Sequence, residues 1–293
     1  MHRILRRSIS IFCTVLILCL GAFSAFASVP EDDPLRASGV RILRCTEVPI
    51  EWKDTHVGCG LMIDSVTFVP VVNFLQLMLG EPCAVDWDQE TRTALIRADG
   101  FSAELDAAQR WINVNGRCLY FPDGVYNING TILAPIRELA KIFALEVTWD
   151  EDAFSIRIEG DEPALFRPGD SYYNVDTLYW LSHVIFSESG NQPLDGMIGV
   201  GNVVLNRVSD KSGAFEDTVK DVIFQEGQFD VVEGGAIYME PSRDAVIAAK
   251  ICMEGYNTVG DCKWFLNPQI GYSSWFRTYK TFVTSIGDHD FYA

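Results

Sequence analysis

The sequence predicts an α+β protein in which a small, two-repeat α+β domain precedes a second domain that starts with a helix. Two observations support this prediction. Residues 66–100 and 131–160 follow one order of elements, in which a strand and a proline lead into a helix and two more strands. Later, Leu181, Val184 and Ile185 recur at the spacing of one helix face. Without a leader, about 265 residues remain, which fits two domains of ordinary size.

The first residues have the pattern of a secretory signal. Three arginines precede an apolar run over residues 11–20, and small residues before Ser28 form a cleavage site. We expect cleavage after Ala27, a secreted or cell-wall protein, and no membrane attachment beyond this export signal. An uncleaved anchor is the alternative, although the run is short for a bilayer span.

The chain is strongly acidic, with 23 basic and 40 acidic residues and a formal net charge of −17. Removal of the three leader arginines leaves 20 basic residues against 40 acidic ones, a charge of −20. Nucleic acid is not expected as a partner, because phosphate binding needs basic patches. A bound polymer is expected to lie in a groove and be held by hydrogen bonds and aromatic stacking.

Six of the eight cysteines remain after the leader is removed. An even number in an exported chain predicts up to three disulfides. Proximity in the sequence favours the pairs Cys45–Cys59, Cys83–Cys118 and Cys252–Cys262. Buried free thiols are the alternative.

The expected domain map has five segments. They are a signal peptide at 1–27, a turn-rich extension at 28–60 with a strand near Val40–Leu43, a repeat domain at 61–160, a linker at 161–172 and a second domain at 173–293. In the repeat domain, Leu139, Ile142 and Phe143 form the buried face of the second helix. Two Asn-Gly pairs, at residues 115–116 and 129–130, predict tight hairpin turns.

The two repeat copies match residue by residue at three places. Pro70 corresponds to Pro135, Trp87 to Trp149 and Asp88 to Asp150, and each proline fits the first turn of its helix. This repeat resembles the stalk-like domain known as the copper amine oxidase N-terminal domain. No histidine occurs within it, so the ligands that copper favours are missing. We expect a spacer, or a domain that makes a weak contact with the cell envelope.

One carboxylate stands at the end of an apolar helix face. Glu188 follows Leu181, Val184 and Ile185 at helical spacing, and the helix is expected to end at residues 189–191. A carboxylate in such a place loses hydration, which raises its pKa towards neutrality. It can then donate a proton near pH 7, as cleavage of a glycosidic bond requires.

Six short motifs occur in order over residues 174–293. They are FSESG with Pro193 after it, VVLNRV at 203–208, EGQFD at 226–230, AAKICMEG at 248–255, WFLNP at 264–268 and IGDHDFY at 286–292. In this order they resemble the cell-wall hydrolase family of the spore-cortex lytic enzyme SleB. The resemblance implies a lysozyme-like, mainly helical fold that acts on peptidoglycan glycan strands, with Glu188 as the catalytic residue. Residues 189–192 depart from the Ala-Arg-Gly-Glu that is common in this family, which affects substrate preference more than reaction type.

The reaction implied by the resemblance is that of a lytic transglycosylase, which needs one acid, no metal and no cofactor. Glu188 protonates the oxygen between N-acetylmuramic acid and N-acetylglucosamine, then removes the proton of the muramoyl C6 hydroxyl as a 1,6-anhydro ring closes. Hydrolysis is the alternative, and Asp195 or Asp230 is then the second carboxylate. The substrate is cell-wall or spore-cortex peptidoglycan.

Seven residues are candidates for binding the glycan. Amides and aromatic rings suit sugars because they bond acetamido groups and stack on sugar faces. The candidates are Asn206, Gln228, Phe229, Trp264, Phe265, Asn267 and Tyr292. For each of them a structural role, as a helix cap, turn residue or core residue, is the alternative.

Three other functions remain open at this stage. An N-acetylmuramoyl-L-alanine amidase needs zinc, and this domain offers only His183 and His289. A cysteine peptidase would pair His289 with Cys252 or Cys262, but Cys252 lies in an apolar helix, where a thiolate is disfavoured. The third is a wall-binding protein without activity.

Overall fold

The computed structural model describes residues 45–160, 163–164, 169–270 and 278–293. The predicted leader, the predicted strand Val40–Leu43 and most of the predicted linker lie outside these ranges. The chain divides into two compact units, one up to Arg167 and one from Pro168 onward, and Gly116–Leu119 group with the second. Within the described ranges, no helix combines the length and apolar character that a membrane crossing requires.

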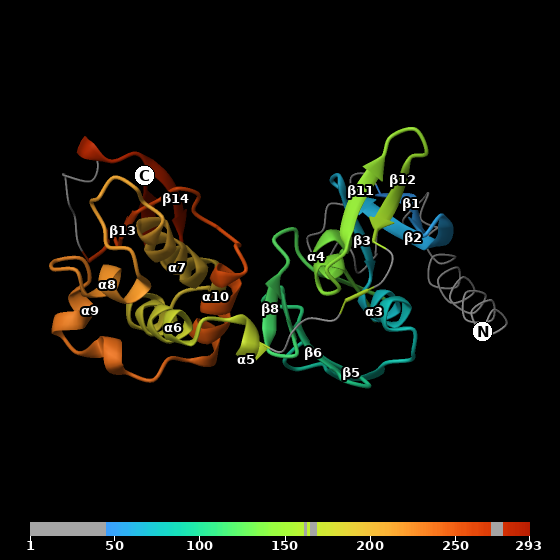
Figure 1. The fold of residues 1–293 in the computed structure, drawn as a ribbon, viewed down its shortest axis with the longest axis horizontal. Helices are drawn as coiled ribbons and strands as arrows, with labels where there is room; N and C mark the ends of the chain where they lie inside the picture. Colours follow the sequence, from blue (N-terminus) through green and yellow to red (C-terminus); the bar gives the residue numbers. More distant parts are fainter. Residues whose placement is uncertain (1–44, 161–162, 165–168, 271–277) are drawn as a thin grey trace, which may run out of the picture. The chain divides into compact units, whose positions relative to one another are not determined.

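A seven-stranded sheet forms the larger part of the N-terminal unit (Figure 1). Its spatial order is β11 (Glu146–Asp150), β12 (Ser155–Glu159), β1 (Cys45–Trp52), β2 (Thr55–Ile63), β3 (Val66–Pro70), β10 (Thr131–Pro135) and β9 (Tyr126–Ile128). The pair β1–β12 is parallel and the other ladders are antiparallel. From Cys45 onward, the segment predicted as a turn-rich extension therefore contributes β1 and most of β2 to this sheet.

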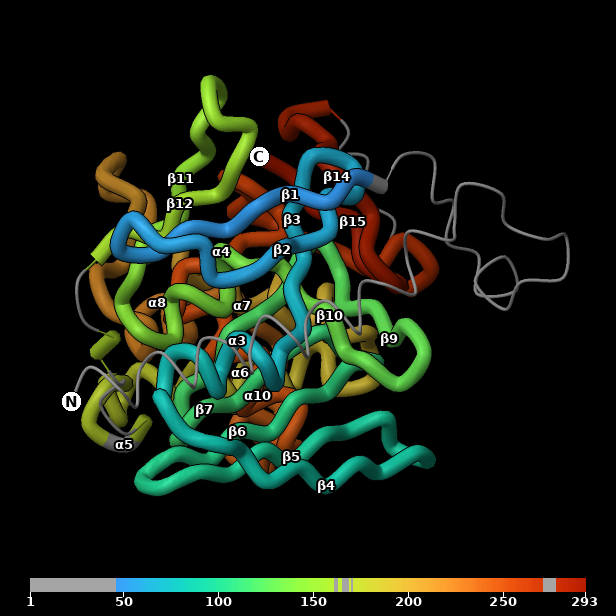
Figure 2. The backbone as a smooth tube through the Cα atoms, turned by 90° about the vertical axis from the view of Figure 1, so that its right-hand side faces the viewer, coloured from blue at the N-terminus to red at the C-terminus, as the bar shows by residue number. Residues whose placement is uncertain are grey.

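The second sheet of this unit has five strands in sequence order. They are β4 (Ala84–Asp88), β5 (Thr93–Ala98), β6 (Phe101–Asp106), β7 (Trp111–Val114) and β8 (Arg117–Tyr120). Helix α3 (Val71–Leu79) lies between the two sheets, and the short helix α4 (Ile136–Lys141) packs on the seven-stranded one (Figures 1 and 2). Phe143, which follows α4, contacts Phe74 of α3 and Phe101 of β6 at ring-centroid distances of 6.4 Å each. These rings join the helices and sheets in one core.

The element order predicted for the repeat is confirmed in both copies. The first copy is β3–α3–β4–β5 and the second is β10–α4–β11–β12. Pro70 and Pro135 are the last strand residues and the N-caps of the helices, one position earlier than predicted. The predicted burial of Leu139, Ile142 and Phe143 is confirmed, but the helix is shorter than predicted: it ends at Lys141, so Ile142 and Phe143 follow it.

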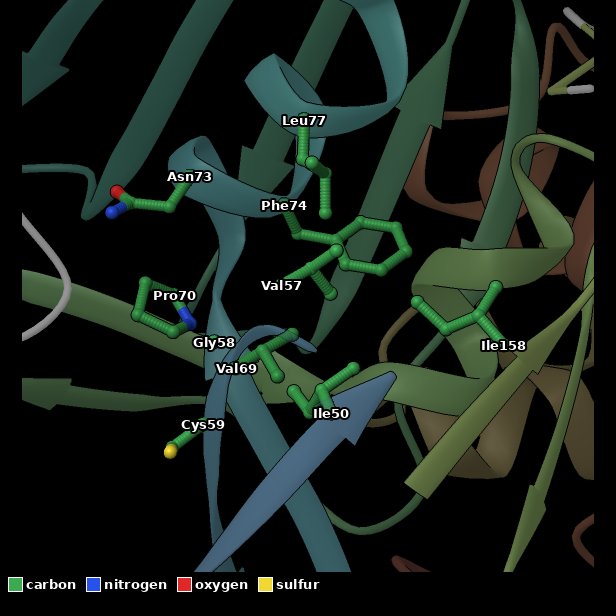
Figure 3. Close-up of a pocket in the computed structure, with 10 residues that line it drawn as sticks. All are labelled: Ile50, Val57, Gly58, Cys59, Val69, Pro70, Asn73, Phe74, Leu77 and Ile158. Carbon is green, nitrogen blue, oxygen red and sulfur yellow. The ribbon is translucent and has the colours of Figure 1, made fainter. Parts of the chain in front are cut away.

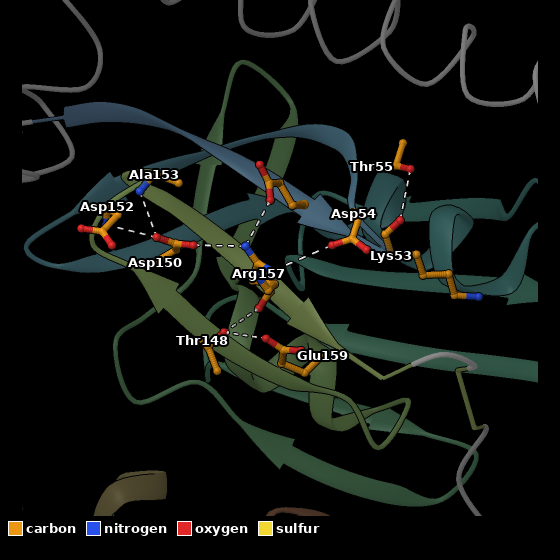
Figure 4. Close-up of polar contacts among 10 residues, drawn as sticks. Lys53, Asp54, Thr55, Thr148, Asp150, Asp152, Ala153, Arg157 and Glu159 are labelled. Carbon is orange, nitrogen blue, oxygen red and sulfur yellow. Dashed lines mark hydrogen bonds and ion pairs between the residues drawn. The ribbon is translucent and has the colours of Figure 1, made fainter.

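The same kind of turn follows the shared Trp-Asp pair in both copies. In each copy the aspartate Oδ1 accepts hydrogen bonds from the backbone N–H groups two and three residues later, at 2.8 and 3.1 Å for Asp88 and 3.1 and 2.9 Å for Asp150. These bonds hold the pKa of both carboxyls below the usual range. Arg157 of β12 also pairs with Asp150 at 3.1 Å and with Glu51 of β1 at 3.8 Å (Figure 4). The second hairpin is thereby tied to β1.

Both predicted Asn-Gly turns are hairpins. Asn115 and Gly116 join β7 to β8 with φ of 48° and 90°, and Asn129 and Gly130 join β9 to β10 with φ of 52° and 84°. Two consecutive residues with positive φ define the tight turn whose twist matches that of the strands.

A small pocket opens between α3 and the seven-stranded sheet (Figure 3). Its walls include Val57, Phe74, Leu77 and Ile158, and one polar side chain, Asn73, contributes to the lining. The lining is therefore suited to apolar packing and offers no charge to a ligand.

The C-terminal unit is mainly helical, as predicted. Its elements are α5 (Gly169–Tyr172), α6 (Val175–Ser189), α7 (Leu194–Val208), α8 (Val219–Phe224), α9 (Asp230–Glu233), a 3₁₀ turn η2 (Ala236–Tyr238), α10 (Arg243–Met253), β13 (Trp264–Leu266), β14 (Phe282–Ile286) and β15 (His289–Tyr292). The strands form one small sheet in the order β13-β15-β14. The fold class predicted from the sequence, α+β with a helical second domain, is confirmed.

Helix α7 packs closely against α6 and α10, and its glycines permit this approach (Figure 1). A Cβ on Gly201 would lie 2.7 Å from the Cys252 sulfur of α10 and 2.8 Å from Ile185 of α6. A Cβ on Gly199 would lie 2.8 Å from the ring of Phe291 in β15. Since real contacts do not reach such distances, glycine at these positions lets the helices and the small sheet share one core.

The predicted disulfides are not present. The β1–β2 register pairs Cys45 with Ile63 and Cys59 with Pro49, so the two cysteines lie four residues apart, roughly 13 Å along the strands and beyond disulfide reach. Cys83, Cys252 and Cys262 carry free thiols, which makes the other two predicted pairs wrong as well. The reason in the second domain is packing. The Cys252 thiol donates to the Ile198 carbonyl at 3.3 Å, whereas Cys262 lies in an apolar cluster with Val200, Val203, Val259 and Phe291.

Candidate active site

Glu188 lies in the last turn of α6, where the sequence predicts it. Asn174 is the N-cap of the helix and its side chain accepts the Thr177 N–H at 2.9 Å, while Gly190 is the C-cap. Leu181, Val184 and Ile185 are fully buried beneath the face that ends in Glu188. The Glu188 side chain itself is half-buried. Nothing in the described ranges forms a hydrogen bond or ion pair with its carboxyl, which leaves both oxygens available to a ligand.

The surroundings of Glu188 raise its pKa to about 7. Burial is the largest cause, because it disfavours the charged carboxylate, and the negative charge of Asp230 at the start of α9 acts in the same direction. The positive charge of Arg207 opposes both effects. At neutral pH a large fraction of Glu188 is therefore protonated, as a general acid requires.

Arg207 is the second charged group of the site. It is the penultimate residue of α7 and is 4% exposed. Its Nε donates to the Lys263 carbonyl at 2.7 Å, and its guanidinium carbon lies 5.2 Å from the ring centre of Phe215 and 5.0 Å from that of Phe229. Burial lowers the pKa of Arg207 to about 10, so the side chain remains a cation at neutral pH.

Two of the predicted glycan-binding residues have structural contacts of their own. Asn206 donates from Nδ2 to the carbonyls of Gly260 and Cys262, at 2.7 and 2.8 Å, which holds the loop before β13 against α7. Phe229 is 6% exposed and lies over Arg207 and 6.5 Å from the ring of Phe265. A sugar contact by Asn206 thus depends on its Oδ1, and one by Phe229 on a narrow exposed edge.

The remaining candidates lie in or near β13, β15 and the turn before α9. Gln228 is half-buried in that turn. Trp264 is half-buried, and the Lys280 ammonium lies 3.1 Å from its ring centre, which covers one face of the ring. Asn267 accepts the Gln269 N–H at 2.9 Å within its own turn. Tyr292 is 3% exposed and contacts Phe282.

Phe265 is the candidate that combines partial exposure with a ring contact leading to Arg207. It is half-buried, and its ring lies 5.2 Å from His289, 6.1 Å from Phe291 and 6.5 Å from Phe229. Through Phe229 it is joined to Arg207, whose charge acts on Glu188. Glycan binding by these residues stays a prediction.

Arg207 is a site residue that the sequence analysis did not select as a candidate. In the sequence, Arg207 follows Val203 by four residues and Val204 by three, so the three residues share one helix face. Both valines are fully buried in the structure, and Arg207 lies on the same buried face. That spacing predicts burial of the arginine. It does not predict closeness to Glu188, which arises from the packing of α7 against α6.

The histidines and cysteines of this unit are held in structural contacts. His183 Nδ1 lies 2.7 Å from the Tyr179 carbonyl one turn earlier, and His289 packs against Phe265. Over the described part of the chain, no three metal-ligating side chains gather into a site. Burial raises the pKa of the Cys252 thiol far above its usual range, which confirms that this position does not favour a reactive thiolate.

Two family models match this chain, one in each unit. Residues 191–292 match the family described as Cell Wall Hydrolase, and residues 60–158 match the Copper amine oxidase N-terminal domain. The first match begins three residues after Glu188. The chain thus contains an enzyme domain of the cell wall hydrolase class. In the sequence this domain follows a domain of the copper amine oxidase N-terminal family. Both resemblances drawn from the sequence are confirmed.

Within that class, the relatives are spore cortex-lytic enzymes of the SleB type. The enzyme of Bacillus cereus is 31% identical over 119 residues, which cover 41% of this chain and 45% of the relative. That of Bacillus subtilis is 29% identical over 131 residues, covering 45% and 41%. The solved catalytic domain of the germination-specific lytic transglycosylase SleB from Bacillus anthracis is 30% identical and covers 41% of this chain and 97% of that domain, with a TM-score of 0.38. The chain spans less than half the length of these curated relatives.

Proposed function

We propose that this protein cleaves the bond between N-acetylmuramic acid and N-acetylglucosamine in peptidoglycan, as a lytic transglycosylase with Glu188 as its general acid and base. The observation that supports the proposal is the state of the Glu188 carboxyl. It is half-buried, without a protein partner within the described part of the chain, and its pKa is raised to about 7. A carboxyl with these properties is protonated often enough to act as an acid and ionised easily enough to act as a base.

The reaction requires one carboxyl in two roles. Glu188 gives its proton to the glycosidic oxygen as the bond from that oxygen to the muramoyl C1 breaks. The C6 hydroxyl of the same sugar then attacks C1, and its proton passes to the Glu188 carboxylate. Glu188 is protonated again at the end, and no water, metal or cofactor is consumed.

Asp230 is the alternative second carboxylate for a hydrolytic route. Its charge acts on Glu188, and its side chain is exposed at the start of α9. If Asp230 activates a water, the product has a free reducing end. We favour the transglycosylase route because the Bacillus anthracis relative, 30% identical in sequence, is a lytic transglycosylase.

The setting of this activity is also a proposal. We propose a secreted protein that reaches the cell wall or spore cortex through the predicted signal, with Phe265, Trp264 and the neighbouring candidates along the glycan. The N-terminal domain then acts as a spacer or as a weak contact with the envelope. The acidity of the chain disfavours adsorption to an anionic wall, so we expect the glycan to be held by hydrogen bonds and ring contacts from residues near Glu188.

The experiment is digestion of vegetative and spore-cortex peptidoglycan by the full chain, beside a Glu188→Gln variant, with mass spectrometry of the products. We expect 1,6-anhydro ends from the wild type and a rate loss of roughly 100- to 10,000-fold in the variant. Reducing ends in place of anhydro ends would replace the transglycosylase with a hydrolase.

A chelator arm separates the amidase alternative. We expect full activity with excess chelator, because the proposed chemistry uses no metal. Loss of activity with chelator, together with full activity of Glu188→Gln and release of stem peptides, would contradict the proposal. Wall binding without any product would identify a binding protein.

A further inference from the structure

Arg207 is a buried cation whose hydrogen-bonding capacity is only partly used. Its Nε bonds the Lys263 carbonyl at 2.7 Å, while its buried Nη1 has no partner among the described residues. The rings of Phe215 and Phe229 lie over the guanidinium at 5.2 and 5.0 Å. The cation is thus held in one place, with a donor left unused.

The protein supplies Arg207 with no ion-pair partner inside the described ranges. The nearby Lys263 ammonium has its own carboxylate, Asp210, at 2.5 Å. Burying a guanidinium is costly unless a negative charge compensates it. The carboxylate whose charge reaches Arg207 is Glu188, which is itself half-buried and without a partner in the described part of the chain.

We propose that Arg207 is a positioning residue that acts through Glu188: its fixed guanidinium, on the helix packed against α6, stabilises the carboxylate that forms when Glu188 gives its proton to the leaving oxygen. The inference rests on the proposed function, because it assigns that role to Glu188. Before the proton transfer Glu188 is neutral and the cation is uncompensated. After the transfer the two opposite charges stabilise each other in a poorly hydrated place, so the transfer is favoured.

The charged groups around Glu188 predict in which direction its pKa moves when one of them is replaced. From α7, Arg207 lowers the pKa of Glu188; from α9, Asp230 raises it. Lys220 of α8 lies over the ring of Trp180, eight residues earlier on α6. The 3₁₀ turn η2 contributes Tyr238, and the charged residues of α10 are Arg243, Asp244 and Lys250. Loss of Arg207 is therefore expected to raise the pKa of Glu188, and loss of Asp230 to lower it.

The test is the pH profile of glycan cleavage by the full chain, in which the alkaline limb reports loss of the protonated acid. We expect the alkaline limb of Arg207→Met to move to higher pH, with a rate loss at the optimum of roughly 10- to 100-fold. Asp230→Asn is the matched control and is expected to move the limb to lower pH. Arg207→Lys keeps a positive charge and is expected to retain a limb near that of the wild type.

Arg207→Gln is made as a second neutral variant, since its amide can still donate to the Lys263 carbonyl, and folding of all variants is checked by circular dichroism. A limb that stays in place in the folded neutral variants would overturn the proposal. Failure of both neutral variants to fold would assign Arg207 to the fold alone and overturn it equally. If Glu188→Gln cleaves as fast as wild type, the proposed function itself fails. If Glu188→Gln is inactive but the alkaline limb of the Arg207 variants does not move, only the role of Arg207 is refuted.

Discussion

The Glu188 carboxyl is half-buried beside an apolar helix face, and two opposite charges act on it. Burial and Asp230 favour its neutral form, and Arg207 favours its ionised form. The balance places its pKa at about 7. In the proposed reaction, a carboxyl deeper in the core would not ionise for the second step, and a fully hydrated one would not hold its proton for the first step.

This balance has a consequence for stability. A glutamate whose pKa is about 4.3 in the unfolded chain and about 7 in the folded one binds more protons when folded, so its contribution to stability is lost as pH rises from about 4.5 to about 7. Glutamine does not titrate. We expect Glu188→Gln to be more stable than wild type at pH 8, on the order of 1–3 kcal/mol, and equally stable at pH 4.

Urea unfolding at the two pH values measures this difference. Glu226→Gln is the control, because Glu226 is exposed in the same domain and its replacement is expected to have little effect at either pH. Equal stabilities of Glu188→Gln and wild type at pH 8 would show that Glu188 is well hydrated in the folded protein.

The sequence predicts part of this site and misses the rest for a physical reason. Glu188 and the end of its helix follow from local spacing along one helix. Arg207 is brought to Glu188 by the contact between two helices, and Lys280 reaches the ring of Trp264 from sixteen residues away in the chain. Such contacts depend on tertiary packing, which one-dimensional patterns do not contain.

Among the elements, the two Asn-Gly hairpins offer a matched pair for a stability test. Asn115 has φ of 48°, and its side chain bonds the Ser102 N–H at 2.9 Å and the Gly100 carbonyl at 3.2 Å. Asn129 has φ of 52°, and at its turn the Gly130 N–H bonds the side chain of Asn127 instead. Both positions disfavour alanine because of the positive φ, and only Asn115 adds side-chain bonds to a neighbouring strand.

We therefore expect Asn115→Ala to lower the free energy of unfolding by roughly 2–4 kcal/mol and Asn129→Ala by roughly 1–2 kcal/mol. The larger loss reflects the two bonds that alanine cannot make. Thermal unfolding of the full chain measures both values. If both variants lose the same free energy of unfolding, the positive φ alone accounts for the loss and the side-chain bonds of Asn115 contribute nothing.

The repeat shows what element order does and does not determine. Proline after a strand, an apolar helix face and the Trp-Asp pair are local signals, and each appears in the structure as predicted. The assignment of hairpins to sheets is not local: β11–β12 joins the seven-stranded sheet through its parallel contact with β1, whereas β4–β5 begins the other sheet. Two copies of one pattern thus enter different sheets, because each hairpin meets a different neighbouring strand.

At the scale of the whole molecule, the C-terminal unit is held by apolar packing and not by covalent links. Cys252 and Cys262 are buried free thiols. We expect excess dithiothreitol to leave the thermal transition of this unit and its activity unchanged. A fall in Tm of roughly 5 °C or more would reveal a disulfide, because loss of a native disulfide costs about 2–5 kcal/mol.

The two compact units combine a repeat domain with a domain of the cell wall hydrolase class in one chain. The acidity of the chain disfavours a charge-driven attraction to an anionic wall. In the proposed function, both recognition and chemistry therefore depend on the neighbourhood of Glu188. The proposed activity therefore depends on the protonation state of Glu188.

Titration of that carboxyl by carbon-13 NMR tests this claim most directly. The signal is assigned by its disappearance in Glu188→Gln, and its chemical shift is followed from acid to alkaline pH in the full chain. We predict a midpoint at about 7. A midpoint at about 4.3, the value of a glutamate in water, would contradict the account.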